Sequence, residues 1–339
     1  MITIKDIARE LGLSVSTVGR ALTDHPRISR ETKERVQEVA KRLDYVANTA
    51  ARVMRGGSSH LISLLVPDIR SGFYSMVAHM LSTGFASEGY HLSLSITDDD
   101  PNREMQQLRE LMSARVAGVV IVPSANPRRE TVEMLSKIPH VQLLRRIASL
   151  GDWFGLDDER AIVEAANHLI GLGHKKIAYI GDNTFPTGKA RYKGFKRAMA
   201  EAGLKIDDSL VLFGPPDSKF GAEAIHKLVQ GRKQPTAIIT GAVLVTLGVA
   251  EQLSALDIKI PDQISIVGFG DGPWQRWWGP GLTTLKLPIE EITTGCALWL
   301  LHRLKTGMQP GKDPHIAVSP TTLVIRSSTA APKSNFVRR

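Results

Sequence analysis

A group of small hydroxyl side chains and one arginine near the start of the chain could bind DNA. Ser14, Ser16 and Thr17 can hydrogen-bond phosphates, and Arg20 can bind a guanine edge through two hydrogen bonds. Helical apolar spacing over 4–11, a glycine at 12 and a second helical pattern over 14–22 predict a helix-turn-helix, whose second helix presents its N-terminal residues to the major groove. The alternative is a small helical bundle whose charged residues are only solvated.

Residues 48–55 form a second candidate DNA contact. Asn48 can cap a short helix that carries Arg52, Met54 and Arg55, and two glycines follow it. Because so short a helix is marginal in water, pairing with a second subunit or folding on DNA would explain it. Met54 could wedge between base steps in the minor groove. The alternative is a helix that only spaces two domains.

The basic charge of the chain is concentrated at its ends. The net charge is +9, and residues 1–60 hold eleven Lys or Arg against seven Asp or Glu. Lys333, Arg338 and Arg339 add to the excess in the tail. An excess of basic residues suggests a polyanionic partner. Because much of this excess lies in residues 1–60, we expect the N-terminal segment to bind that partner.

Signatures of enzymes and metal sites are incomplete or missing. The stretch 181–189 ends in Gly-Lys like a phosphate loop, but its glycines are too far apart and Ala190 stands where a magnesium-binding hydroxyl is needed. No dinucleotide fingerprint follows a strand-like run, and His168 and His174 lack metal-ligand spacing. Cys296 lies in an apolar run, which favours a buried position. We therefore expect no catalytic residue, no cofactor and no metal.

Cysteine usage and hydropathy bear on the compartment. A single cysteine cannot form an internal disulfide, charges at 5, 6, 9 and 10 preclude an apolar signal core there, and no run is long enough to span a membrane. These features predict a cytoplasmic protein without a membrane partner.

The remaining pattern predicts an α/β fold with a helical N-terminal part. Thr3, Ser14 and Ser29 are positioned as N-caps of three helices. From residue 60, short apolar runs alternate with helical segments, as in parallel sheets that are covered on both faces. The strand–helix units are too numerous for a single open sheet of ordinary size. We therefore expect two doubly wound lobes with a ligand cleft between them. The runs are 61–66, 92–96, 119–122, 141–144, 177–180, 210–213, 237–240 and 265–269.

Taken together, the chain resembles the LacI/GalR family of bacterial transcriptional regulators from Thr3 to about Thr329. The matching segments are 3–8, 15–22, 66–68, 173–178, 191–195, 235–238, 260–262, 267–269, 282–284 and 326–329. The resemblance implies a helix-turn-helix headpiece and a two-lobed core of the periplasmic-binding-protein type. It also implies a homodimer, or a higher assembly, that binds a palindromic operator in double-stranded DNA, usually as a repressor, with a small effector in the cleft.

The resemblance also assigns domains and DNA contacts. It implies a headpiece over 1–46, a hinge helix and linker over 47–59, a core over 60–330 and a basic tail over 331–339. Within the core, the first lobe would comprise about 60–158 with 287–316, and the second 159–286 with 317–330. The DNA-binding residues would be Thr3, Ser14, Val15, Ser16, Thr17, Arg20, Asn48, Arg52, Met54 and Arg55.

The effector site departs from the family pattern. Arg145, Ala242 with Val243, and Gly270 stand where sugar-responsive relatives carry acidic or amide groups, whereas the ligand-binding Arg191 is retained. Because guanidinium groups bind carboxylate or phosphate, this favours a sugar acid, another organic acid or a phosphosugar. The alternative is a neutral ligand, with Arg145 pointing to solvent or paired with Asp157 or Asp158. The effector-binding set is then Phe73, Tyr74, Arg145, Arg191, Gly270 and Trp274.

Two other classes of protein remain as rivals. A transport solute-binding protein would share the two-lobed core, but residues 1–55 and the lack of an export signal argue against it. An enzyme on a doubly wound fold would need a phosphate loop, a dinucleotide fingerprint or a convergent acid–base set. Deletion of residues 1–58 would distinguish these classes, because only a regulator would lose DNA binding and keep its ligand.

Overall fold

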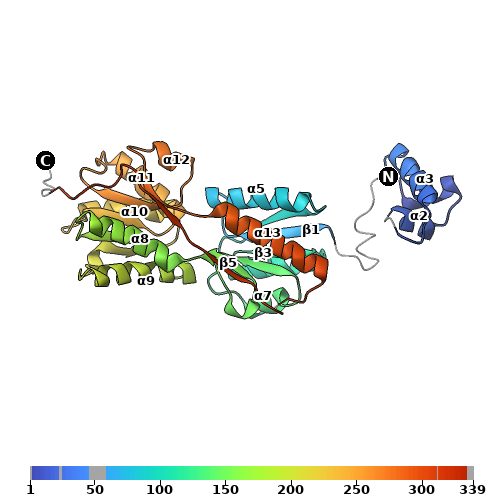
Figure 1. Ribbon diagram of the computed structural model, residues 1–339, viewed down its shortest axis with the longest axis horizontal. Coiled ribbons are helices and arrows are strands. Elements are labelled where there is room, and N and C mark those ends of the chain that lie inside the picture. Colours follow the sequence, from blue (N-terminus) through green and yellow to red (C-terminus); the bar gives the residue numbers. More distant parts are fainter. Residues whose placement is uncertain (1, 23–24, 46–58, 311, 334–339) are drawn as a thin grey trace. The chain divides into compact units, whose positions relative to one another are not determined.

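The computed structural model describes residues 2–22, 25–45, 59–310 and 312–333. The chain divides into two compact units, Met1–Ser59 and His60–Arg339, each with its own hydrophobic core (Figure 1). The predicted helix over 48–55, with Asn48, Arg52, Met54 and Arg55, lies outside the described residues, as do Arg338 and Arg339 of the tail.

The described residues of the first unit form three helices, α1 (Ile4–Leu11), α2 (Val15–Leu22) and α3 (Arg30–Arg42). The three predicted N-caps are confirmed. Thr3 forms a reciprocal capping box with Asp6, the Ser14 hydroxyl accepts from the Thr17 amide at 3.1 Å, and Ser29 accepts from Thr32 at 3.3 Å. Apolar residues at helical spacing then close one small core between the helices, namely Ile7, Ala8, Val18, Ala21, Val36, Val39 and Ala40.

The second unit contains two six-stranded sheets, one in each lobe. The first sheet has the order β11-β5-β4-β3-β1-β2, and all its strand pairs are parallel. Its strands are β1 (Leu61–Val66), β2 (His91–Ile96), β3 (Gly118–Ile121), β4 (His140–Leu143), β5 (Trp153–Leu156) and β11 (Ile316–Ser319). Helices α5 (Gly72–Ala86) and α13 (Ile289–Thr306) pack on one face, and α6 (Pro101–Ser113) and α7 (Arg129–Leu135) pack on the other.

The second sheet has the order β12-β10-β9-β8-β6-β7, and only its edge pair β12–β10 is antiparallel among the strands described. Its strands are β6 (Ile177–Gly181), β7 (Val211–Phe213), β8 (Ala237–Thr240), β9 (Ser265–Phe269), β10 (Thr283–Lys286) and β12 (Thr322–Val324). Helices α8 (Asp158–Gly171) and α9 (Pro186–Glu201) cover one face, while α10 (Ser218–Gln230) and α11 (Val243–Ala255) cover the other. A short helix, α12 (Pro273–Trp277), follows β9.

These lobes confirm the predicted α/β fold class, but four strands were missed. The strands β5, β10, β11 and β12 are only three or four residues long, and β11 and β12 are edge strands whose side chains are largely exposed or half-buried. The proposed end of the first lobe at residue 316 is also wrong. Because all of β11 pairs with β5, the first lobe continues to Ser319. Among the described residues, no helix is long and apolar enough to cross a membrane.

Candidate functional site

The N-terminal turn of α2 presents the predicted hydroxyl cluster. The Ser14 Oγ lies 2.8 Å from both the Ser16 Oγ and the Thr17 Oγ1, so the structure brings these three groups together. Val15 is 40% exposed between them, and Arg20 is exposed on the same helix. Thr3 lies exposed at the start of α1, where its hydroxyl donates to Asp6 at 2.7 Å. The arrangement offers hydrogen-bonding groups and an apolar contact at one helix end, as a major-groove reader requires.

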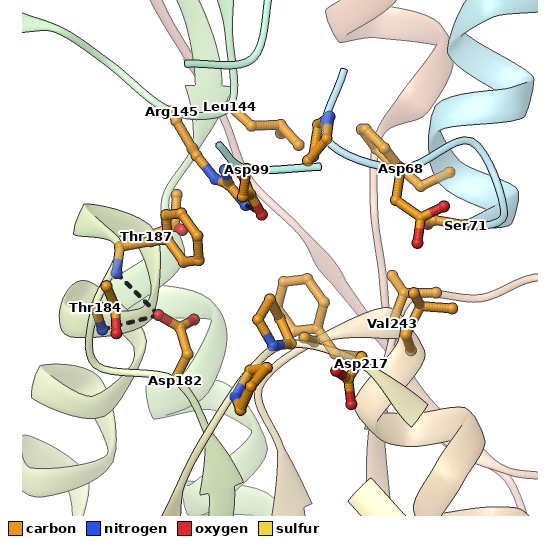
Figure 2. A pocket seen from close by; sticks show the side chains of 18 of the residues that line it. Asp68, Ser71, Asp99, Leu144, Arg145, Asp182, Thr184, Thr187, Asp217 and Val243 are labelled. Atoms are coloured by element: carbon orange, nitrogen blue, oxygen red, sulfur yellow. Dashed lines mark hydrogen bonds and ion pairs between the residues drawn. The ribbon is translucent and has the colours of Figure 1, made fainter. Parts of the chain in front are cut away.

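A cavity of about 670 Å³ lies between the two lobes of the second unit (Figure 2). Loops that follow the carboxyl ends of β1, β2, β4, β6, β7 and β8 line it, together with Phe269 at the end of β9, and this is where ligands bind in doubly wound folds. Its size is that of a small-molecule site. The charged residues that line it are five aspartates and three arginines, namely Asp68, Asp98, Asp99, Asp182, Asp217, Arg70, Arg145 and Arg191.

Arg145 lines the cavity, but its charge is already paired. The backbone at Leu144 turns sharply with φ of 59°, and the Arg145 amide donates to the Leu143 carbonyl at 2.7 Å. This turn directs the guanidinium to the Asp99 carboxylate and to the Pro123 carbonyl at 3.2 Å. The guanidinium carbon also lies 3.6 Å from the centre of the Phe185 ring, so a side chain of the first lobe stacks on one of the second. Neither alternative expected for Arg145, exposure to solvent or a pair with Asp157 or Asp158, is correct.

Arg191 is held in the same way from within the second lobe. Its Nε donates to Asp158 at 2.7 Å, one terminal nitrogen donates to the Gly241 carbonyl at 2.7 Å, and its guanidinium carbon lies 4.0 Å from the Phe269 ring centre. Arg191 is 8% exposed and Asp158 is 6% exposed. An ion pair this buried has little free charge to offer a ligand.

Of the other predicted effector contacts, Phe73 and Tyr74 line the cavity, whereas Gly270 and Trp274 do not. The Gly270 amide donates to Leu285, and a Cβ at this glycine would meet Val243 at 3.0 Å rather than open space. Trp274 packs against the core on the α10–α11 side of the second lobe. Both residues therefore lie outside the lining of the cavity, because the chain beyond β9 turns into the lobe instead of along the cleft.

The sequence prediction also missed the aspartates of the cavity. Asp98 and Asp99 follow β2, Asp182 follows β6, and Asp217 caps α10 after β7. Their position in the loops that follow parallel strands is a signal that could have identified them. The family positions suggested a pocket with few carboxylates, but five aspartates line the cavity, and they come from other loops.

Comparison with known proteins decides the family. Residues 3–48 match the model of bacterial regulatory proteins of the lacI family, and 166–329 match that of a periplasmic binding protein-like domain. The chain is 31% identical to the HTH-type transcriptional regulator DegA of Bacillus subtilis (strain 168), over 97% of this chain and 98% of DegA. It is also 31% identical to the catabolite control protein A of Priestia megaterium, over 86% of this chain and 89% of that protein. The chain belongs to the LacI/GalR family.

The fold of this LacI/GalR-family chain agrees with solved structures. The lac repressor dimer bound to operator and the anti-inducer ONPF matches it with a TM-score of 0.83 at 20% identity, over 97% of this chain and 99% of that one. The chain is therefore a DNA-binding transcriptional regulator with an effector-binding domain, and the expectation that it is not an enzyme is confirmed by its relatives. In this family member, α1 and α2 belong to the DNA-binding domain, while the cavity lies in the unit that contains the binding-protein-like domain.

Proposed function

We propose that the chain is a repressor that binds a palindromic operator as a homodimer, and that a small effector in the interlobe cavity changes its operator affinity. The observation that carries the proposal is the 670 Å³ cavity, because residues of both lobes line it. A ligand bound there contacts both lobes and can favour one arrangement of them over another.

The coupling would be a linkage between two binding sites. If effector and operator prefer different arrangements of the lobes, each weakens the binding of the other. If they prefer the same arrangement, the effector acts as a co-repressor and each strengthens the other. A cavity between two lobes is consistent with an effector that weakens operator binding and with one that strengthens it.

The paired charges change the class of effector that we propose. The sequence favoured a sugar acid, another organic acid or a phosphosugar that Arg145 and Arg191 would bind. An anion would instead have to compete with Asp99 and Asp158 for these guanidinium groups, in a cavity with two more negative than positive side chains. We therefore propose a hydroxyl-bearing effector without net negative charge, which includes the neutral sugar that was the alternative.

The proposal is tested by measuring operator affinity with and without a ligand that stabilises the protein in a thermal-shift screen. We expect the ligand to change the operator Kd by about 5–150-fold. A ligand that binds in the cavity and leaves the operator Kd unchanged would contradict the effector role. Deletion of residues 1–58 should abolish operator binding and preserve ligand binding, because the two units have separate cores.

A further inference from the structure

Building on the proposed effector role of the cavity, we infer that the effector carries a protonated amino group bound by Asp182 and Asp217. Both aspartates belong to the second lobe and follow neighbouring strands, because β6 pairs with β7 through Gly181 and Phe213. They therefore occupy the same edge of the cavity, with Phe213, Pro215 and Pro216 also lining it there.

The other charges of the cavity have partners in the protein. Arg70 pairs with Asp68 at 2.9 Å, Arg145 pairs with Asp99, and Arg191 pairs with Asp158 at 2.7 Å. The remaining acid of the first lobe, Asp98, pairs with Arg103. Within the part of the chain that the structure describes, no lysine, arginine or histidine lies within ion-pairing distance of Asp182 or Asp217. The negative excess of the cavity is therefore located at these two residues.

Asp182 is held in place by backbone amides. It is 4% exposed, and its Oδ1 accepts from the amides of Thr184 and Phe185 at 3.1 and 3.0 Å. These bonds position the carboxyl group at the start of the loop before α9 and bring no cation to it. Figure 2 shows the second oxygen turned toward the open middle of the cavity. A buried carboxylate without a cation is costly, so a ligand that supplies the cation gains affinity from it.

Asp217 offers a second carboxylate on a rigid support. Its Oδ1 accepts from the Phe220 amide at 2.8 Å as the N-cap of α10, which fixes the side chain beside the cavity. Phe213, the last residue of β7, also lines the cavity, and an aromatic ring can attract a cation. Two carboxyl groups at one edge of the cavity suit an ammonium group better than a hydroxyl, because a hydroxyl brings no positive charge to them.

The first experiment compares ligands of one shape and three charges on the full chain. Glucosamine, glucose and glucuronate, with the corresponding galactose and mannose triplets, are titrated in thermal-shift and calorimetric assays. The proposal expects stabilisation by at least one amine and a Kd at least about tenfold below that of its neutral counterpart. A neutral or acidic member that binds as tightly as its amine overturns the proposal, and so does a set in which no amine binds.

The second experiment removes the charges and keeps the structural hydrogen bonds. Asp182→Asn and Asp217→Asn retain an oxygen that accepts from the same backbone amides, so each fold should be preserved. Each variant should weaken binding of the amine found in the first experiment by about tenfold or more. Asp257→Asn, at an exposed pair with Lys259 outside the cavity, is the matched control and should leave the Kd unchanged.

If all three variants lose the same affinity for the amine, the loss reflects the overall charge of the protein, and the assignment of Asp182 and Asp217 as its binding residues is overturned.

The two proposals can fail separately. If a neutral sugar binds and shifts operator affinity, the amine inference fails while the effector-gated repressor stands. If an amine binds at Asp182 and Asp217 without altering the operator Kd, the effector role fails instead.

Discussion

The role of a charged residue in this protein depends on the charge that faces it. Arg145 and Arg191 have the identities of an anion site, yet both are bound to carboxylates and stacked on aromatic rings. Arg145 thereby connects the lobes through Phe185, while Asp182, which the sequence did not single out, directs its second carboxyl oxygen toward the cavity. At the DNA-binding end, the hydroxyls of α2 bond one another and Arg20 extends from the same helix.

Replacement of Arg20 by alanine should weaken specific operator binding by about 1–3 kcal/mol, because a guanidinium on a recognition helix forms two hydrogen bonds with guanine. Fluorescence anisotropy with operator and with unrelated DNA measures the change. Arg30→Ala is the control, since Arg30 is exposed at the start of α3 and pairs with Glu34. If operator and unrelated DNA lose the same affinity, Arg20 contacts phosphate and not a base.

At the scale of the elements, close approach between helices depends on particular glycines. Gly248 lies in α11, where a Cβ would come within 1.8 Å of the Ser218 carbonyl oxygen at the start of α10. This contact holds together the helix pair that covers one face of the second sheet. Gly171, at the end of α8, has no atom within 4 Å of the corresponding position.

Gly248→Ala should therefore lower the free energy of unfolding by about 1–3 kcal/mol or more, because backbone must move to admit the methyl group. Gly171→Ala makes the same change in open space and should be neutral or stabilising by up to about 1 kcal/mol. Urea unfolding of both variants gives the comparison. If both variants are destabilised to a similar extent, the lower free energy of unfolding comes from the reduced backbone freedom of alanine and not from the contact between α10 and α11.

Helix α13 is attached to the first sheet by a buried ion pair. Arg303 bonds both oxygens of Asp152 at 2.7 and 2.8 Å and three backbone carbonyls beyond the helix, and both side chains are almost fully buried. Arg303→Ala leaves the Asp152 charge unpaired and should cost about 3–5 kcal/mol in the free energy of unfolding. Lys305 lies on the same helix and forms an exposed ion pair with Glu88. Lys305→Ala should therefore lower the free energy of unfolding by less than about 1 kcal/mol. A cost below 1 kcal/mol for Arg303→Ala as well would mean that water enters and solvates Asp152.

At the scale of the whole molecule, the C-terminal segment ties distant parts of the second lobe together. Ser328 bonds both the backbone of Ile266 and the amide of Thr283, and Ala330 accepts from the His174 Nε2 at 2.8 Å. Because a carbonyl can only accept, this nitrogen carries a proton, and the Nδ1 lies 2.9 Å from the Thr236 hydroxyl.

Burial lowers the pKa of His174 in the folded state below its ordinary value. The stability that this group contributes is therefore complete above pH of about 6.5, the unfolded value, and is lost as the pH falls through the folded-state pKa. We expect the free energy of unfolding, measured in urea between pH 8 and pH 5, to decline at the acidic end. His174→Gln can make both hydrogen bonds without titrating and should reduce the slope. The slope should not vanish, because burial also lowers the pKa of His140 and His168. An unchanged slope in the variant would assign the pH dependence to other groups.

The sequence by itself determined the features that depend on neighbours along the chain. The caps at Thr3, Ser14 and Ser29, the strands between 61 and 269 other than β5, and the helix-turn-helix spacing follow from local hydrogen bonding and periodicity, so they could be predicted. Only the tertiary structure decided the charge balance of the cavity. Arg145 meets Asp99 across 46 residues because the order of strands brings the loops after β2 and β4 to one edge of the sheet. Ion pairing depends on distance in space, and the sequence does not specify that distance until the strands have been ordered.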